Sequence, residues 1–166
     1  KLMGEHNFQN IKTAVTLGKY FKVPGKKIKA AIENYNPNMN RSQVVPWGSN
    51  SILLDAYNAN PSSMEVALRT FSESPASQRI AILGDMFELG ESSAVEHERI
   101  AQLAKSLNIA QVILVGHHFE AIARQLGWLH FPNVGALKPW FEAQQWGNTA
   151  FLIKGSRGMA LEKLLG

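Results

Sequence analysis

RIAILG, at residues 79–84, is a continuous apolar run that ends at a glycine, and this pattern recurs further along the chain. The later copies are QVILVG at 111–116 and AFLIKG at 150–155, where Lys154 precedes the glycine. Strands buried on both faces have such runs, whereas strands with one face in water alternate apolar and polar residues. These segments therefore predict the central strands of a mostly parallel sheet.

Segments with helical periodicity alternate with these strands. Repeated β-then-α units predict an α/β fold, an open, doubly wound sheet with right-handed crossovers. Further strands are expected at 43–47 and 51–56, paired as a hairpin, and a weaker one at 129–134. One helix is expected to begin after Asn60, and four more are expected at 93–107, 119–126, 137–145 and 159–165. In the helix at 93–107, the residues expected to face the core are Val95, Ile100, Leu103 and Leu107.

A different pattern occupies the start of the chain. Helical spacing predicts two helices before the polar stretch NPNMNRSQ, which begins at Asn36. We therefore expect residues 1–36 to be the helical tail of a different domain, 37–41 to be a linker, and 42–166 to be the sheet domain. Because the sequence opens at Lys1 without an initiator Met, we take it to be a piece of a longer protein.

Composition narrows the class of ligand. Of the 166 residues, 45% are apolar, which is enough for a core, and the net charge of +4 is scattered along the chain. A mild, dispersed positive charge suits a nucleotide or another small anion better than it suits duplex nucleic acid. The absence of cysteine excludes disulfides and thiolate metal sites. No apolar stretch approaches the roughly 20 residues of a membrane span.

Polar residues follow the strands at the edge where doubly wound sheets bind their ligands. In DAYNANPSSM, the Asp55 carboxylate could accept hydrogen bonds from a ribose diol. The amides of Asn58 and Asn60 could contact a base or orient a water molecule. The alternative is structural: Asp55 forms a turn, and Asn60 caps a helix that Pro61 opens.

Two other loops leave the same choice open. In LGDMFELG, Asp85 and Glu88 could position a cation or a substrate amine, or could form a solvated turn. In KGSRGM, Lys154, Ser156 and Arg157 could bind a carboxylate or a phosphate, or could form a basic turn.

Histidines and glycines give weaker signals. His97 follows the acidic loop in a predicted helix and, by its position alone, reads as a surface histidine. The adjacent His117 and His118 have no partners at metal-ligand spacing, so no metal site is predicted. GKYFKVPGKK fails as a phosphate loop, because six residues separate its glycines and Lys27 stands where Ser or Thr is required.

In their order along the chain, these motifs resemble those of the carboxyl-terminal part of the Mur ligase family. GEHNFQN, NRSQ, DAYNANPSSM, LGDMFELG with His97, and KGSRGMALE carry the resemblance, which covers the whole chain. The resemblance implies that Asn7 contacts adenine, that Arg41 reaches the nucleotide from the linker, and that Asp55 holds the ribose. It places Tyr57 and Asn58 in the same cleft and, on the side of the peptide and dipeptide substrates, Asp85, Glu88, His97, Lys154, Ser156 and Arg157.

The resemblance also implies a reaction. ATP would phosphorylate the carboxylate of UDP-N-acetylmuramoyl-tripeptide, and the amine of D-alanyl-D-alanine would then displace phosphate from the acyl phosphate. This would be a cytoplasmic step of peptidoglycan precursor synthesis that uses ATP and Mg²⁺. The phosphate loop, most of the Mg²⁺ ligands and the two preceding domains are expected upstream, so these 166 residues by themselves are not expected to catalyse it.

Two other functions remain open. One is a sibling ligase of the same superfamily, such as a folylpolyglutamate synthase-like enzyme, against which the string DAYNANP argues. The other is a nucleotide- or peptide-binding module that has no catalytic activity.

Overall fold

The computed structural model describes residues 5–35 and 42–166, with the side chains described from Phe8 onward. The chain forms two compact units, Lys1–Asn38 and Met39–Gly166. The first unit is a hairpin of the helices α1 (Glu5–Tyr20) and α2 (Gly25–Asn34). These helices approach closely at Gly18, where a Cβ atom would lie 2.8 Å from the Cδ1 atom of Ile28.

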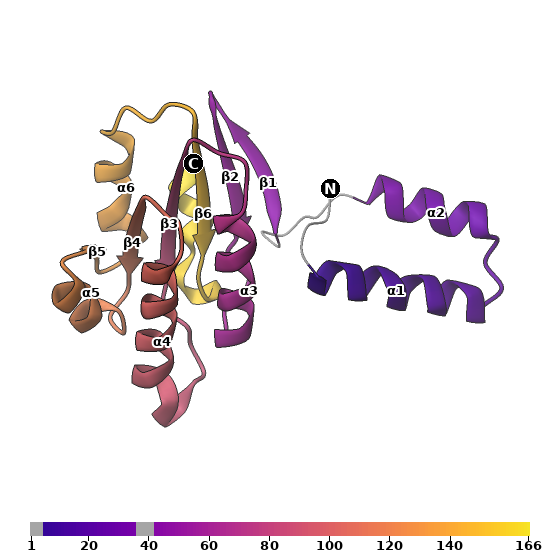
Figure 1. Ribbon diagram of the computed structural model, residues 1–166, viewed down its shortest axis with the longest axis horizontal. Coiled ribbons are helices and arrows are strands. Elements are labelled where there is room, and N and C mark those ends of the chain that lie inside the picture. The colour runs from indigo at the N-terminus through magenta and orange to yellow at the C-terminus, as the bar shows by residue number, and fades with distance from the viewer. Residues whose placement is uncertain (1–4, 36–41) are drawn as a thin grey trace. The chain divides into compact units, whose positions relative to one another are not determined.

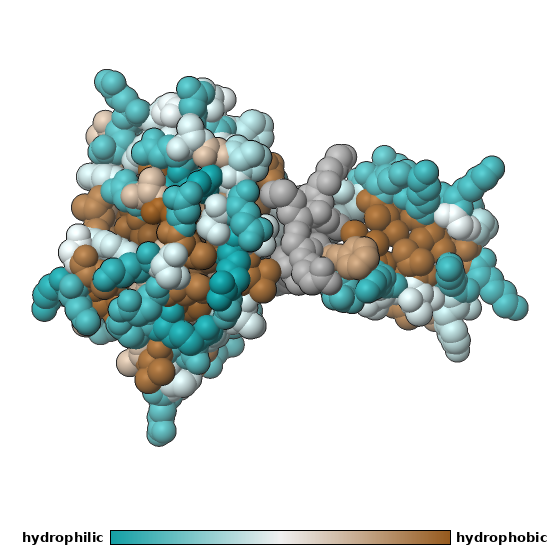
Figure 2. Space-filling model, in the orientation of Figure 1, coloured by the Kyte–Doolittle hydropathy of each residue, from teal (hydrophilic) through white to brown (hydrophobic). Residues whose placement is uncertain are grey.

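The helical hairpin exposes much of its apolar surface. None of the described side chains of α2 is buried, and the residues Tyr20 and Phe21 are 77% and 71% exposed. A hollow of about 400 Å³ between the helices is lined by Val15, Ile28 and Ile32, among others. Figure 2 shows apolar residues gathered on this unit. Two helices of this length bury too little surface to form a stable core of their own.

The second unit is built on a six-stranded sheet with the order β1-β2-β6-β3-β4-β5 (Figure 1). The strand β1 is antiparallel to β2, and all the other neighbours are parallel. The predicted mostly parallel sheet and its opening hairpin are therefore confirmed. The strands are β1 (Gln43–Trp47), β2 (Asn50–Asp55), β3 (Gln78–Gly84), β4 (Gln111–Val115), β5 (Leu129–Phe131) and β6 (Thr149–Lys154).

Helices cover both faces of this sheet, as the continuous apolar strands predicted. Because side chains alternate along a strand, Leu152 of β6 belongs to one core and Ile153 to the other. The first core is closed by α3 (Pro61–Ser72), α4 (Ser93–Ser106) and α5 (Glu120–Leu126), and the second by α6 (Val134–Glu142) and the 3₁₀ helix η3 (Leu161–Leu165).

The helix expected at 159–165 is wrong in type. The chain instead forms two 3₁₀ helices, η2 (Arg157–Met159) and η3, separated by Ala160 in the left-handed region at φ +49°. Leu161 then packs against Gly84 and Gly155, which lie close together at the ends of β3 and β6, and a Cβ atom on either glycine would lie 2.9 Å from the leucine Cδ1 atom. This tight return of the chain after β6 leaves no room for a regular α-helix to begin.

Two details of the other helices also differ from expectation. Val95 is 69% exposed, because the buried stripe of α4 begins with His97 and continues through Ile100, Ala101 and Ala104. The helix α6 begins at Val134, before the expected residue 137, because the side chain of Asn133 caps it by accepting the N–H of Ala136. No helix within 5–35 and 42–166 has the length and apolar character needed to cross a membrane.

The strand order fixes which loops meet. Since β2, β6, β3 and β4 are parallel neighbours, their carboxyl ends lie side by side at one edge of the sheet. In the strand register, Lys154 lies opposite Asp55 on one side and opposite Leu83 on the other. The loops that begin at Asp55, Asp85 and Gly155 therefore gather at this carboxyl edge.

Candidate functional site

Asp55 and Lys154 form an ion pair at the carboxyl edge. The Lys154 Nζ atom lies 2.5 Å from Asp55 Oδ2 and also donates a hydrogen bond to the carbonyl oxygen of Asn58 at 3.1 Å. The side chain of Lys154 is 2% exposed, so its charge is compensated inside the protein. The sequence assigned Asp55 to the nucleotide and Lys154 to the substrate side, and the structure brings the two together.

Asp55 keeps capacity for a ligand. Its side chain is 18% exposed, and its second oxygen accepts the N–H of Ser42 at 3.0 Å. A carboxylate has about four acceptor positions, so two bonds do not saturate it. Asn58 is exposed and Tyr57 is half-buried. The Oδ1 atom of Asn58 accepts the N–H of Ala59 at 2.8 Å. This group of residues fits a polar, uncharged partner such as a sugar diol.

Asn60 is a helix cap, as the structural alternative stated. Its Oδ1 atom accepts the N–H of Ser63 at 2.9 Å, and its own N–H donates to the Ser63 hydroxyl at 3.1 Å. Pro61 takes the first position of α3, where its missing N–H costs nothing. In the sequence DAYNANPS, the functional candidate Asp55 therefore ends β2, and a capping box begins α3.

Asp85 is buried between the ends of β3 and β4 and is 2% exposed. Its carboxylate accepts the N–H of His118 at 3.0 Å and that of Phe119 at 3.3 Å, just before α5 begins. Gly116 makes room for it: this glycine has φ +115°, and a Cβ atom there would lie 2.4 Å from the carboxyl carbon. A substrate contact by Asp85 stays a prediction, and it would require the loop after β3 to move.

His97 packs against the same loop and is fully buried, so its interpretation as a surface histidine is wrong. Its Nε2 atom accepts the N–H of Met86 at 2.9 Å, and its Nδ1 atom donates to the Ser93 carbonyl at 2.7 Å, which assigns the neutral Nδ1–H tautomer. Burial lowers the pKa of His97 from its ordinary 6.5 and outweighs the Ser93 carbonyl and Asp85, which raise it. The imidazole faces the protein interior, and the predicted substrate contact of His97 stays a prediction.

Ser156 joins the loops of the carboxyl edge. Its hydroxyl accepts the N–H of Phe87 at 2.8 Å, and its N–H donates to the Asp85 carbonyl at 3.0 Å. Phe87 is 40% exposed, and its ring lies on Gly158, where a Cβ atom would be 2.7 Å from the ring. Sequence analysis missed Phe87, although an aromatic residue between two acids, in a loop that follows a buried strand, was a usable signal.

The remaining substrate-side residues are at the surface. Glu88 is exposed, in the left-handed region at φ +63°. The side chain of Arg157 is 60% exposed, and its guanidinium lies 3.1 Å from Glu162 Oε1. The carboxylate of Glu88 and the guanidinium of Arg157 are therefore accessible charged groups beside Phe87. The predicted nucleotide contacts of Arg41 and of the Asn7 side chain lie outside the described residues.

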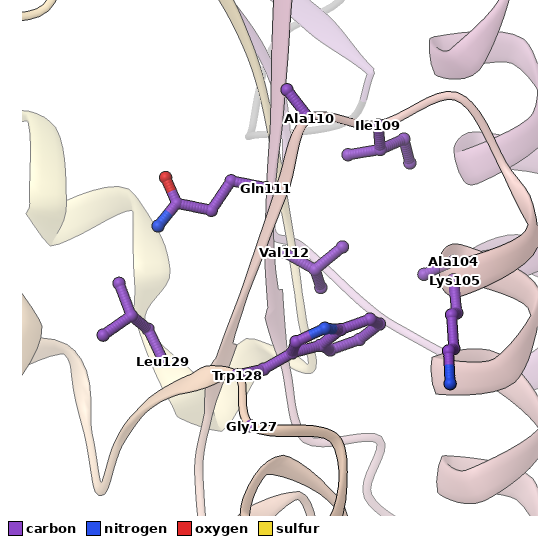
Figure 3. A pocket seen from close by; sticks show the side chains of 9 residues that line it. All are labelled: Ala104, Lys105, Ile109, Ala110, Gln111, Val112, Gly127, Trp128 and Leu129. Carbon is purple, nitrogen blue, oxygen red and sulfur yellow. The ribbon is translucent and has the colours of Figure 1, made fainter.

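A recess lies at the other end of the strands, away from the carboxyl edge. It is a surface pocket of about 310 Å³, lined by residues such as Lys105, Gln111 and Trp128 near the end of α4 and the start of β4 (Figure 3). None of the predicted site residues lines it, and the candidate site is therefore the carboxyl edge. Within the described ranges, no three side chains of His, Asp or Glu are grouped so that they could hold a metal ion.

Comparison with known proteins identifies the family of the chain. Residues 40–157 match the family described as "Mur ligase, glutamate ligase domain". The UDP-N-acetylmuramoyl-tripeptide–D-alanyl-D-alanine ligase of Treponema pallidum (strain Nichols) is 34% identical over 170 residues, which cover 98% of this chain and 37% of the relative.

Solved structures extend the match. A crystal structure of MurF from Acinetobacter baumannii has a TM-score of 0.83 at 28% identity, covering 99% of this chain and 37% of that one. MurF of Thermotoga maritima, in complex with ADP, shares the fold with a TM-score of 0.65 at 22% identity, covering 80% of this chain and 31% of that one.

The chain thus spans 37% of the length of the Treponema pallidum relative. The family match begins before β1 and extends through β6, so it includes every strand of the sheet described here. The resemblance that the motifs indicated is confirmed. This chain belongs to the Mur ligase family.

Proposed function

We propose that the chain is the carboxyl-terminal part of an ATP-dependent ligase that joins D-alanyl-D-alanine to UDP-N-acetylmuramoyl-tripeptide. The relatives that match nearly the whole chain are named for this reaction, and one neighbour of the same fold is described in complex with ADP. The reaction would be a cytoplasmic step in the synthesis of peptidoglycan precursors.

The observation that carries the proposal is the Asp55 carboxylate, oriented by Lys154 and still able to accept further hydrogen bonds. A ribose diol would donate two hydroxyl hydrogen bonds to it, and Lys154 would hold the carboxylate in one orientation. Tyr57 and Asn58, which follow directly in the chain, would line the same cleft. Asn7 and Arg41 would complete the contacts to the nucleotide.

The acceptor side would lie along the loops that Ser156 joins. An incoming dipeptide carries a carboxylate and a reactive amine, and the exposed Arg157 and Glu88 have the complementary charges. Asp85, His97 and Lys154 would act from beneath the surface, by holding these loops. Ser156 is itself buried, and its bonds to Phe87 and Asp85 would serve to hold these loops together.

Other parts of the ligase would supply the remaining chemistry. The exposed apolar surface of the α1–α2 hairpin supports its assignment to a preceding domain. The chain has no Gly-x-x-x-x-Gly-Lys-Ser/Thr sequence, so the phosphate loop, together with most of the Mg²⁺ ligands, would belong to the rest of the protein. When bound, Mg²⁺ would neutralise charge on the transferred phosphoryl group.

The test is ligation by the complete protein that carries this chain. Incubation with ATP, UDP-N-acetylmuramoyl-tripeptide and D-alanyl-D-alanine should yield the muramoyl pentapeptide, with ADP and phosphate formed in equal amounts. Omitting the dipeptide should abolish the product. Glutamate addition to a folate in place of this product would favour the folylpolyglutamate synthase-like alternative. Nucleotide binding without ligation of either substrate would favour the binding module.

A further inference from the structure

Three consecutive backbone N–H groups of the loop after β3 bond to three different elements. The bonds run from Asp85 to the carbonyl of Val115 at the end of β4 (3.1 Å), from Met86 to His97 Nε2 on α4 (2.9 Å), and from Phe87 to the hydroxyl of Ser156 after β6 (2.8 Å). These bonds favour one conformation of the loop, since each of the three amides would lose its acceptor if the loop moved.

The middle bond differs from the other two because its acceptor can be protonated. An imidazole nitrogen accepts a hydrogen bond only while it carries no proton. The titratable groups that face His97 are Asp85, whose Oδ1 atom lies 3.9 Å from Nε2, and His118, whose ring centre lies 5.1 Å away. On its own helix, Ser93 occupies the other ring nitrogen. Protonation of Nε2 would point an N–H at the N–H of Met86 and break this bond.

The loop presents side chains to solvent directly after these bonds. The Phe87 ring lies on Gly158 next to Arg157, and Glu88 follows at φ +63° with its carboxylate exposed. The positions of both side chains depend on the backbone that Met86 anchors. A shift of this backbone would move the ring and the carboxylate together.

We propose that His97 is a positioning residue: through the N–H of Met86, its neutral imidazole fixes the loop so that Phe87 and Glu88 face the amine-bearing acceptor. This inference rests on the proposed function and assigns to His97 a role without substrate contact. On this account, binding of the acceptor D-alanyl-D-alanine requires a neutral His97 imidazole, and binding of the nucleotide does not.

Two variants of the complete protein separate this role from general stability. In His97→Gln, the side-chain oxygen can accept the Met86 N–H but cannot titrate between pH 5 and 8. In His97→Leu, the acceptor is lost. We expect His97→Leu to raise the KM for D-alanyl-D-alanine roughly tenfold, the effect of a buried N–H without a partner, with the KM for ATP changed less than about twofold. His97→Gln should restore most of the acceptor KM.

The pH profile supplies a readout that a merely structural histidine would not change. In the wild type, the KM for the dipeptide should rise more steeply as the pH falls below the ordinary histidine range than it does in His97→Gln, where only protonation of the dipeptide's own amine contributes. Amide hydrogen exchange at Met86, measured on the 166-residue chain, should be protected in wild type and His97→Gln and fast in His97→Leu.

An unchanged dipeptide KM in a folded His97→Leu variant overturns the proposal, and so does the same acid rise in His97→Gln. If His97→Leu does not fold, the pH profile of His97→Gln decides alone. A wild-type protein that performs no ligation contradicts the proposed function, and Met86 exchange then still decides whether His97 holds the loop.

Discussion

Asp55 has two roles, and a substitution there affects both. Its carboxylate is the partner of the buried Lys154 ammonium and also the candidate ligand for a ribose. Removing one member of a buried ion pair leaves the other charge uncompensated, which is more costly than removing both. Any loss of nucleotide affinity in an Asp55 variant must therefore be read beside the stability of the same variant.

A double-mutant cycle at Asp55 and Lys154 tests the ion pair. Asp55→Ala alone should lower the free energy of unfolding by about 3–5 kcal/mol, because Lys154 stays buried and charged. Lys154→Met together with Asp55→Ala should recover most of this loss. Urea denaturation of the 166-residue chain measures all four corners of the cycle. Additive losses in the double variant would show that the two side chains do not interact.

Among the elements, the β4–α5 connection carries a backbone requirement. Gly116 has φ +115°, and a Cβ atom there would enter the carboxyl group of Asp85. Gly116→Ala should therefore destabilise the sheet unit by at least about 2 kcal/mol, from backbone strain and the displaced carboxylate. The matched control is Gly147→Ala, where nothing lies within 4 Å of the new atom and φ is not in the left-handed region. The control should be neutral or stabilising by up to about 1 kcal/mol. Equal melting temperatures of the two variants would contradict this account.

The α4 helix should contribute a pH dependence through His97. Burial lowers the pKa of this side chain from 6.5, so in acid the unfolded chain takes up the proton before the folded one does. The free energy of unfolding should therefore fall as the pH drops below about 6.5, until the lowered pKa of the folded state is passed. His97→Gln should remove this part of the slope. Denaturant unfolding of wild type and variant between pH 4 and 8 provides the comparison, and parallel curves would exclude the effect.

The sequence predicted the elements well where burial dictated the pattern. Ile80–Leu83 and Val112–Val115 are apolar because both faces of β3 and β4 are covered, and that pattern sufficed to predict a parallel sheet. It could not predict η3, since the turn at Ala160 is imposed by the packing of Leu161 on Gly84 and Gly155, which lie at the ends of two neighbouring strands. The prediction that Val95 faces the core was also wrong, because the residue that faces the core in this part of α4 is the polar His97.

The residues of the candidate site could be predicted from the sequence, but the contacts between them could not. Each of Asp55, Lys154 and Ser156 stands at the end of a predicted strand, so their common edge followed from the parallel topology. The pairing of Asp55 with Lys154 depends on β2 and β6 being neighbours, which sequence spacing does not specify. The bond from Met86 to His97 likewise needs the depth at which α4 packs.

At the scale of the whole molecule, the chain contributes part of a site. It has no Gly-x-x-x-x-Gly-Lys-Ser/Thr sequence, so these residues would not form the loop that binds the phosphates of ATP. The purified 166-residue chain should therefore show no ATP-dependent ligation, while its sheet unit unfolds cooperatively. Mass spectrometry for the amide product checks this, and ligation by the chain alone would place the catalytic machinery within it.

The central claim is that the carboxyl edge holds the nucleotide through Asp55, and titration of the complete protein with ATP tests it most directly. Asp55→Asn, which removes the charge but keeps the shape, should raise the Kd for ATP by about ten- to hundredfold, equivalent to roughly 1.5–3 kcal/mol for hydrogen bonds to a charged group. Asn60→Ala, which removes a cap on the next element, should cost about 1 kcal/mol of stability and leave the Kd within about twofold. A folded Asp55→Asn variant that binds ATP as tightly as the wild type would contradict the claim.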